Sequence, residues 1–268
     1  ELVRASERPE YHVHYAIKAN ANKPVLDLIS DFGLGADCVS GNEIEKAIKS
    51  GFSSQSVVFA GVGKTDSDIC FALANDIFCF NCESIQEIEV INELAGSLDK
   101  KARIAVRINP GINACTHKHI TTGLNENKFG VSEHQLNSVL EKIAASPNVT
   151  LDGIHFHIGS QITKMYVFRE LCAKINRINL WIKERGIELN HINVGGGLGI
   201  DYEFPQLNPV PNFTSYFDLF GKFLHLLPGQ NVHFELGRSI VGQCGSLVTK
   251  VLFIKEGIRH DFVVCDAG

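Results

Sequence analysis

Short apolar runs rich in β-branched residues alternate with amphipathic stretches along most of this 268-residue chain. Candidate strands occupy residues 11–17, 35–39, 56–60, 77–81, 103–108, 151–158, 191–194 and 232–235. The first four begin roughly twenty-one residues apart, which is room for one strand, one helix and two turns. This alternation predicts a parallel sheet covered by helices, and eight strands are the number that closes a (β/α)8 TIM barrel. A doubly wound open sheet is the alternative, but it requires no such count.

The segments between the strands have helical periodicity. After residue 165, apolar side chains step by three and four along one face, at Phe168, Leu171, Ile175, Ile178 and Ile182. The same spacing recurs at Phe213, Phe217, Phe220, Leu224 and Leu227. Helix starts are indicated by Pro24 in a first turn and by two capping-box spacings directly after strands, Ser40 with Glu43 and Ser84 with Glu87.

The pattern changes after the eighth strand. Residues 246–254 and 261–265 are apolar and β-branched, with no helical segment between them. We therefore predict a barrel over residues 1–239 and the beginning of a β-rich domain over residues 240–268, truncated at Gly268. Because the chain also begins close to its first strand, we expect it to be a fragment, a barrel with trimmed ends.

Composition excludes several classes of partner. A formal net charge of -5 and a pI of about 6.1 do not favour nucleic acid or an anionic membrane surface. No apolar run is long enough to cross a bilayer, and the charged residues 1–10 do not resemble a signal peptide. We therefore expect a cytoplasmic protein.

The cysteines are scattered through a long chain without an export signal, which predicts reduced thiols rather than a disulfide framework. They are Cys38, Cys70, Cys79, Cys82, Cys115, Cys172, Cys244 and Cys265. Only Cys79 and Cys82 form a C-x-x-C pair, and no second pair follows at close spacing, so zinc or redox chemistry is not favoured.

Polar residues follow the predicted strands at the end where barrel enzymes carry their active sites. In chain order they are Lys18, Asp37, Ser40, the segment 61–64, Glu83, Arg107, His157, Ser160, Gly195 to Gly197, and the segment 235–238. Because the carboxyl ends of all barrel strands surround one mouth, these side chains are expected to share one site. Phosphate groups favour the loops after strands seven and eight of such barrels.

Each of these features also has a simpler interpretation. A lysine at a strand end is usually only solvated. The pairs His12/His14 and His155/His157 could hold a metal ion or could be packed, hydrogen-bonded side chains. The glycines 195–199 could form a plain turn or close their amides around a phosphate.

Two phosphate-binding fingerprints are rejected. The dinucleotide fingerprint fails because Ile200 occupies its last glycine position. Gly63-Lys64-Thr65 resembles the end of a P-loop, but Val58 stands where the first glycine should be.

Five ordered motifs resemble those of the fold-type III pyridoxal-phosphate decarboxylases. YAIKAN at 15–20 is similar to the family's cofactor-lysine motif, and GIHFHIGSQ at 153–161, NVGGGLG at 193–199 and ELGR at 235–238 follow in the family's order. Thr116-His117, Thr122-Gly123 and Lys128-Phe129-Gly130 are most similar to the diaminopimelate decarboxylase branch. The related alanine racemases would continue after Asn20 with tyrosine and glycine, whereas this chain has Ala21-Asn22-Lys23.

The resemblance implies a role for each matching residue. Lys18 would attach pyridoxal 5'-phosphate covalently, and Glu235 would keep the pyridine nitrogen protonated. His157 would stack on the ring, and Arg238 would bind a substrate carboxylate or the phosphate. The phosphate would lie among Ser160, Gly195, Gly196, Gly197 and Gly237, with Asp37 and Arg107 also near the cofactor. Leu236, inside the ELGR motif, stands where the family usually has proline.

The resemblance also implies an activity, decarboxylation of meso-2,6-diaminoheptanedioate to L-lysine and carbon dioxide in lysine biosynthesis. It implies a homodimer with shared active sites and a small amino-acid substrate. The family's active-site cysteine motif and phosphate-binding tyrosine lie in a C-terminal domain absent from this sequence, so none of the cysteines here is assigned that role.

Three alternatives stay open. The first is a decarboxylase of ornithine, arginine or carboxynorspermidine with the same fold. The second is a non-catalytic pyridoxal-phosphate-binding barrel, which would need no second domain. The third is a metal-dependent barrel hydrolase that would use His12, His14, His155 and His157 with an acid from strand eight.

Overall fold

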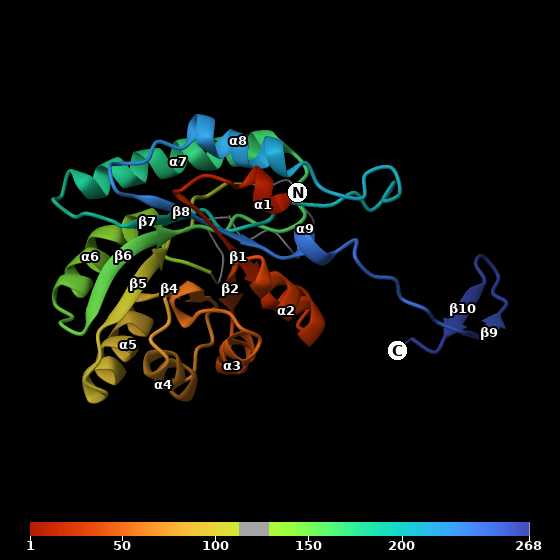
Figure 1. Cartoon of the computed structure of the whole chain (residues 1–268), viewed down its shortest axis with the longest axis horizontal. Helices are drawn as coiled ribbons and strands as arrows, with labels where there is room; N and C mark the ends of the chain where they lie inside the picture. Colours follow the sequence, from red (N-terminus) through yellow and green to blue (C-terminus); the bar gives the residue numbers. More distant parts are fainter. Residues whose placement is uncertain (113–128, 268) are drawn as a thin grey trace.

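A computed structural model describes residues 1–112 and 129–267 of the chain. Eight parallel strands form a closed barrel in sequence order, and β1 pairs with β8 through a register that begins at Tyr11 and Val232. The strands are β1 Tyr11–Ala16, β2 Gly35–Cys38, β3 Val57–Phe59, β4 Cys79–Cys82, β5 Ala102–Arg107, β6 Val149–His155, β7 His191–Asn193 and β8 Asn231–Leu236. The predicted (β/α)8 barrel is therefore confirmed (Figure 1).

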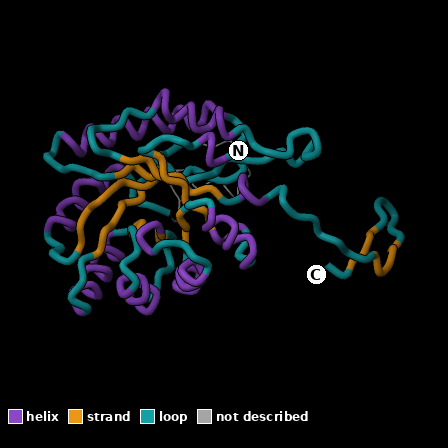
Figure 2. Tube along the Cα trace, viewed as in Figure 1, coloured by secondary structure: helices purple, strands orange, loops and turns teal. Residues whose placement is uncertain are grey.

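Helices surround the barrel, as the tube view shows (Figure 2). The longer ones are α2 Lys23–Asp31, α3 Gly41–Lys49, α4 Asp66–Ala74, α5 Ile85–Ser97, α6 Leu136–Ala144, α7 Met165–Lys183 and α8 Phe213–Phe223. Short helical turns are α1 Leu2–Ala5, η1 Ile17–Ala19, η2 Ser54–Ser56, η3 Glu133–Gln135 and α9 Arg238–Val241.

The predicted apolar face of α7 is confirmed, since all five of its expected residues are buried. The prediction for α8 was too long. Phe213, Phe217 and Phe220 are buried in the helix, but Leu224 has extended backbone angles and Leu227 lies beyond the helix end. Leu227 precedes Pro228, and the proline ring disfavours a helical conformation in the residue before it.

The two predicted capping boxes are only half formed. The hydroxyls of Ser40 and Ser84 accept hydrogen bonds from the backbone N–H groups three residues later, at the starts of α3 and α5. The glutamate carboxylates, however, accept from the backbone N–H of Val39 and of Glu83, one residue before each serine. Each glutamate side chain therefore hydrogen-bonds its helix to the backbone directly after the preceding strand.

The hydrophobic core lies mainly between the strands and the helices. Its largest fully buried side chains include Tyr15, Phe59, Phe156, Phe168 and Phe234. A separate small cluster of Val58, Cys79 and Ala105 also packs together.

Histidines gather at the N-terminal end of the barrel. A 2.7 Å hydrogen bond joins His14 Nε2 to His233 Nδ1, and His14 Nδ1 lies 3.0 Å from the carbonyl oxygen of Ser56. The ring of His233 stacks on Phe78, with 4.8 Å between the ring centroids. A Cβ atom on Gly35 would lie 2.4 Å from His14 Nδ1, so the glycine leaves the space that this imidazole occupies.

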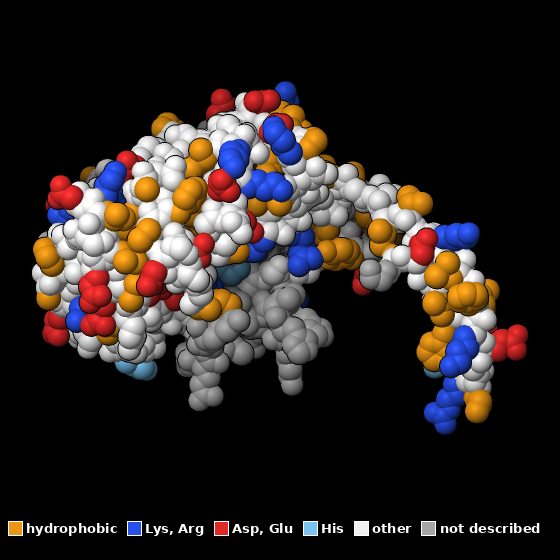
Figure 3. Space-filling view, turned by 90° about the horizontal axis from the view of Figure 1, so that it is seen from below, with side chains coloured by type: hydrophobic (Ala, Val, Ile, Leu, Met, Phe, Trp, Pro, Cys, Tyr) orange, Lys and Arg blue, Asp and Glu red, His pale blue; other side chains and the backbone are white. Residues whose placement is uncertain are grey.

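After α9 the chain forms an antiparallel hairpin of β9 Val251–Lys255 and β10 Phe262–Cys265. Its apolar side chains are exposed, among them Phe253, Ile254 and Val263. Figure 3 shows hydrophobic side chains on the surface of this part of the chain. A β-rich segment thus follows the barrel as expected, while the division at residue 239 stays a prediction.

No helix within residues 1–112 and 129–267 has the length and apolar character that a membrane span requires. The seven described cysteines form no disulfide with one another, and Cys79 and Cys82 are both buried in β4. Cys115 lies outside the described residues.

We predict that acid destabilises the barrel through its buried histidines. Burial lowers the pKa of His14 to about 4, so between its ordinary pKa and this value only the unfolded state gains a proton. His14 alone should therefore reduce the free energy of unfolding by about 2 kcal/mol between about pH 7 and about pH 5. Urea unfolding at both pH values measures this loss.

Two variants complete that experiment. His14→Gln keeps a hydrogen-bonding side chain that does not titrate, and it should lose less stability on acidification. His12→Gln, at an exposed position on the same strand, should keep the full loss. Equal acid sensitivity in His14→Gln and in the unsubstituted chain would contradict the prediction.

Candidate active site

A cavity of about 520 Å³ opens at the C-terminal end of the barrel. Eight of the residues predicted from sequence line it, namely Lys18, Asp37, His157, Ser160, Gly197, Glu235, Gly237 and Arg238. The structure therefore brings together side chains from both ends of the barrel sequence. Ala16, Ala19, Tyr202, Val241 and Gly242 complete the lining.

Lys18 forms an ion pair with Asp37 across this cavity. Lys18 lies in η1, directly after β1, and its Nζ is 3.1 Å from Asp37 Oδ2. The lysine side chain is half exposed, whereas Asp37 is buried. The charge of Asp37 raises the pKa of Lys18. Burial raises the pKa of Asp37 to about 6 against the opposing charge of Lys18, so both groups are charged at neutral pH.

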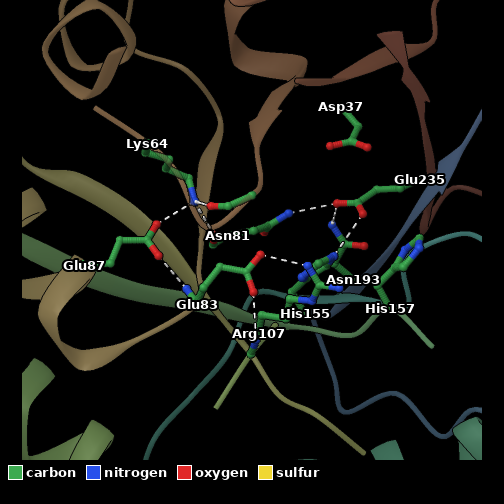
Figure 4. Close-up of polar contacts among 12 residues, drawn as sticks. Asp37, Lys64, Asn81, Glu83, Glu87, Arg107, His155, His157, Asn193 and Glu235 are labelled. Atoms are coloured by element: carbon green, nitrogen blue, oxygen red, sulfur yellow. Dashed lines mark hydrogen bonds and ion pairs between the residues drawn. The ribbon is translucent and has the colours of Figure 1, made fainter. Parts of the chain in front are cut away.

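Glu235 is a buried carboxylate near the end of β8, and three N–H groups surround it (Figure 4). Asn81 Nδ2 and Asn193 Nδ2 each donate to its Oε1 at 2.8 Å. His155 Nε2 lies 2.9 Å from its Oε2. Burial acts to raise the pKa of Glu235, but the charge and hydrogen bond of His155 outweigh it and lower the pKa. Glu235 is therefore ionised.

His157 follows β6 and faces the same cavity. Burial, reinforced by the charge of Arg107, lowers the pKa of His157 to about 3. The backbone N–H of Gly196 points at its Nδ1 from 3.4 Å, a long hydrogen bond that requires an unprotonated nitrogen. His157 is thus a neutral imidazole, suited to packing against a planar group rather than to carrying charge.

The glycines after β7 pack closely against neighbouring backbone. A Cβ atom on Gly196 would lie 1.7 Å from the carbonyl oxygen of Glu235, so only glycine fits there. A Cβ atom on Gly197 would lie 2.5 Å from the carbonyl oxygen of Gly159, and its φ of 100° also favours glycine. Gly197 lines the cavity, whereas Gly195 and Gly196 lie behind its wall.

Arg238, the first residue of α9, lies beside Ser160 and Tyr202 in the cavity lining. Its guanidinium donates to the hydroxyl of Tyr202 at 2.5 Å and, more weakly, to Ser160 Oγ at 3.4 Å. Its Nε is buried and has no hydrogen-bond partner among the residues that the structure describes. This unused donor, with the Ser160 hydroxyl, suits an anion.

Besides Gly195 and Gly196, two further predicted residues lie away from the cavity lining. Arg107 is buried and its Nη1 donates to Glu83 Oε1 at 2.8 Å, while its guanidinium lies over the ring of Phe129. Leu236 is fully buried in the hydrophobic core. Arg107 acts on the site through its charge near His157, without reaching the cavity surface.

Sequence reasoning assigned no site role to Asn81, Asn193 or Tyr202. It left His155 open as a metal ligand or a packed, hydrogen-bonded side chain, and the structure shows it hydrogen-bonded to Glu235. Asn81, His155 and Asn193 lie at or near the ends of β4, β6 and β7 and are buried. The sequence feature that could have identified these three residues is their polarity within strands that are otherwise apolar. Such residues in a barrel interior require polar partners.

The histidines of the metal-hydrolase alternative do not form one cluster. His12 and His14 pack against His233, whereas His155 bonds Glu235 and His157 lines the cavity. Lys64, from the rejected P-loop pattern, is buried and donates to the carbonyl oxygens of Gly61 and Asn81. Of the motif at residues 116–130, residues 116–128 lie outside the described residues.

Comparisons with known proteins agree with this geometry. The pyridoxal binding domain of the pyridoxal-dependent decarboxylases matches residues 3–242. A diaminopimelate decarboxylase of Bacteroides thetaiotaomicron is 53% identical over 260 residues, which cover 97% of this chain and 67% of that protein. One from Aquifex aeolicus is 39% identical, over 97% of this chain and 61% of its own length.

A solved structure is also similar. The crystal structure of diaminopimelate decarboxylase from Helicobacter pylori complexed with L-lysine superposes with a TM-score of 0.91 at 38% identity, and the match covers 100% of this chain and 66% of that one. The chain thus spans about two thirds of the length of these relatives. Because the domain match covers the whole barrel, the chain belongs to the pyridoxal-dependent decarboxylase family.

Proposed function

We propose that this chain is the cofactor-binding barrel of a decarboxylase that converts meso-2,6-diaminoheptanedioate to L-lysine and carbon dioxide with pyridoxal 5'-phosphate. The observation that carries the proposal is the pairing of an amine, Lys18, with a buried carboxylate, Glu235, in the lining of one cavity. The relatives named above are diaminopimelate decarboxylases, which supports the choice of substrate.

The cavity residues fit pyridoxal phosphate. The cofactor requires an amine for covalent attachment, a site for its phosphate and a group that controls its ring nitrogen. Lys18 supplies the amine, and Arg238, Ser160 and the amides near Gly197 and Gly237 suit the phosphate. The unused buried Nε of Arg238 supports an anion there. When bound, pyridoxal phosphate accepts the electron pair that a departing carboxylate leaves behind.

The residues of this chain prepare that chemistry. Lys18 reacts only as the neutral amine, so Asp37 controls how readily the cofactor is attached. Glu235, held as an anion, keeps a proton on the ring nitrogen, which makes the ring a better electron acceptor. His157, being neutral, packs on a ring face without adding charge. Gly195 and Gly196 support the cavity wall from behind, and Arg107 and Leu236 would act from outside the lining.

The proposed substrate loses one carboxylate as carbon dioxide at its D-configured carbon, and a proton takes its place. Arg238 would bind a carboxylate of the substrate where the phosphate does not occupy it. We also propose a homodimer with shared active sites, as the resemblance of the motifs to those of the family implies. An ornithine, arginine or carboxynorspermidine decarboxylase is the second candidate, and the third is a cofactor-binding barrel without catalysis.

We predict that the cofactor attaches at Lys18. The chain is incubated with pyridoxal phosphate and reduced with borohydride, and peptide mass spectrometry should find one adduct, at Lys18. Lys18→Ala should abolish the adduct. Lys23→Ala, which removes another exposed lysine in an ion pair with aspartate, should leave it unchanged. An adduct elsewhere in the folded chain would refute the assignment.

Asp37 should slow this attachment at neutral pH. Because the charge of Asp37 raises the pKa of Lys18, Asp37→Asn increases the fraction of neutral amine, about tenfold for each unit by which the pKa falls. Attachment, followed by cofactor absorbance, should be faster in Asp37→Asn near pH 7, and the difference should shrink in alkaline solution. Asp27→Asn, at the exposed pair with Lys23, should have no effect. Equal rates in all three proteins would contradict this role.

The substrate proposal is tested with the whole protein. Carbon dioxide release should be fastest from meso-2,6-diaminoheptanedioate and at least about tenfold slower from ornithine, arginine and carboxynorspermidine, because a site with paired polar groups rejects analogues that leave them unpaired. No turnover of the first, with turnover of another, would move the assignment to that substrate.

A further inference from the structure

Asn81 is a fully buried polar side chain that the fold alone does not explain. It lies in β4, and its Nδ2 donates to Glu235 Oε1 at 2.8 Å (Figure 4). Its Oδ1 is buried with no hydrogen-bond partner in the described part of the chain. A carboxylate only accepts hydrogen bonds, so the amide nitrogen must face Glu235. The side chain thus leaves one of its own polar atoms unsatisfied in order to serve Glu235.

The backbone of Asn81 is fixed by a partly buried ion pair. Lys64, whose side chain is 1% exposed, donates to the carbonyl oxygen of Asn81 at 2.9 Å and to Glu87 Oε1 at 2.5 Å. The second oxygen of Glu87 accepts the backbone N–H of Glu83 at 2.7 Å. The buried ammonium of Lys64 and the partly buried carboxylate of Glu87 thereby hold the end of β4 in place, and with it the distance from Asn81 to Glu235.

The other two donors to Glu235, Asn193 and His155, each affect the site in a second way. Asn193 also accepts the backbone N–H of Gly195 at 2.9 Å, so it shapes the glycine loop. His155 acts on Glu235 through its charge as well as through its hydrogen bond. Asn81 does neither, and a change at Asn81 therefore isolates the effect of one hydrogen bond on Glu235.

We propose that Asn81 is a positioning residue that keeps Glu235 ionised and directed at the ring nitrogen of the cofactor. This inference rests on the proposed function. A proton between Glu235 and the ring nitrogen can reside on either, and each N–H group bound to Glu235 stabilises the carboxylate form. Asn81 therefore favours the proton on the ring. Titratable groups also surround Glu235. They are His14 from β1, Lys18 from η1, Asp37 from β2, Cys79 from β4, His155 and His157 from β6 and the loop after it, and Tyr216 from α8.

The test uses pyridoxal phosphate carrying ¹⁵N at the ring nitrogen, bound to the chain and observed by NMR. The ¹⁵N chemical shift separates a protonated ring from a neutral one. The unsubstituted chain should give the protonated value. Asn81→Leu removes the donor while keeping the number and branching of the side-chain heavy atoms, and it should move the proton-transfer equilibrium about tenfold toward Glu235, the effect of one hydrogen bond to a charged group.

Asn179→Leu is the matched control. Asn179 is also a buried asparagine, but it bonds Gln230 in the outer layer of the barrel at 2.8 Å. This variant should keep the ¹⁵N shift of the unsubstituted chain. Asn81→Val, smaller and suited to a strand, serves if Asn81→Leu does not fold, with the same expected change.

The outcomes separate the inference from the proposed function. If the unsubstituted chain binds no cofactor at Lys18, the proposed function fails. If it binds the cofactor with a protonated ring but Asn81→Leu and Asn81→Val give the same shift, only the role of Asn81 is overturned. A neutral ring in the unsubstituted chain, or an equal change in Asn179→Leu, would also overturn that role.

Discussion

The pairing of β1 with β8 is the constraint on which the site depends. These strands come first and last in the barrel, and their register sets His14 opposite Glu235 and Tyr15 opposite Leu236. Lys18, two residues past the end of β1, is thereby brought into the same cavity as Glu235. Because the ladder is continuous with the rest of the barrel, the two groups are positioned by the most rigid part of the fold.

Closing the barrel creates an interior in which each polar side chain needs a partner. Glu235 is stable there as an anion because three N–H groups from three other strands replace the water that it loses. At the opposite end, histidines satisfy the same requirement by staying neutral and bonding one another. The small side chains of Val58, Cys79 and Ala105 form an apolar cluster that carries no such requirement.

The sequence predicted the barrel well because hydrophobic periodicity and strand count follow from which residues are buried. Lys18 and Glu235 could also be predicted from the sequence, since residues at the carboxyl ends of barrel strands meet at one mouth. The role of Asn81 could not be predicted, because its hydrogen bond to Glu235 depends on the tilt and stagger of strands far apart in the sequence. The helix ending at Phe223 and the glutamates that reach past their serines depend on local backbone geometry, which residue spacing alone does not determine.

The close approach of Gly196 to the carbonyl oxygen of Glu235 changes how a glycine-rich loop is interpreted in evolution. Gly196 is not among the residues with a left-handed backbone, so its own conformation would tolerate alanine. The neighbouring strand is what excludes a larger residue. A descendant of this barrel that lost its cofactor would still be under selection to keep glycine at this position. Retention of this glycine therefore records the packing of β7 against β8, and it is a poor marker of whether a barrel still binds phosphate.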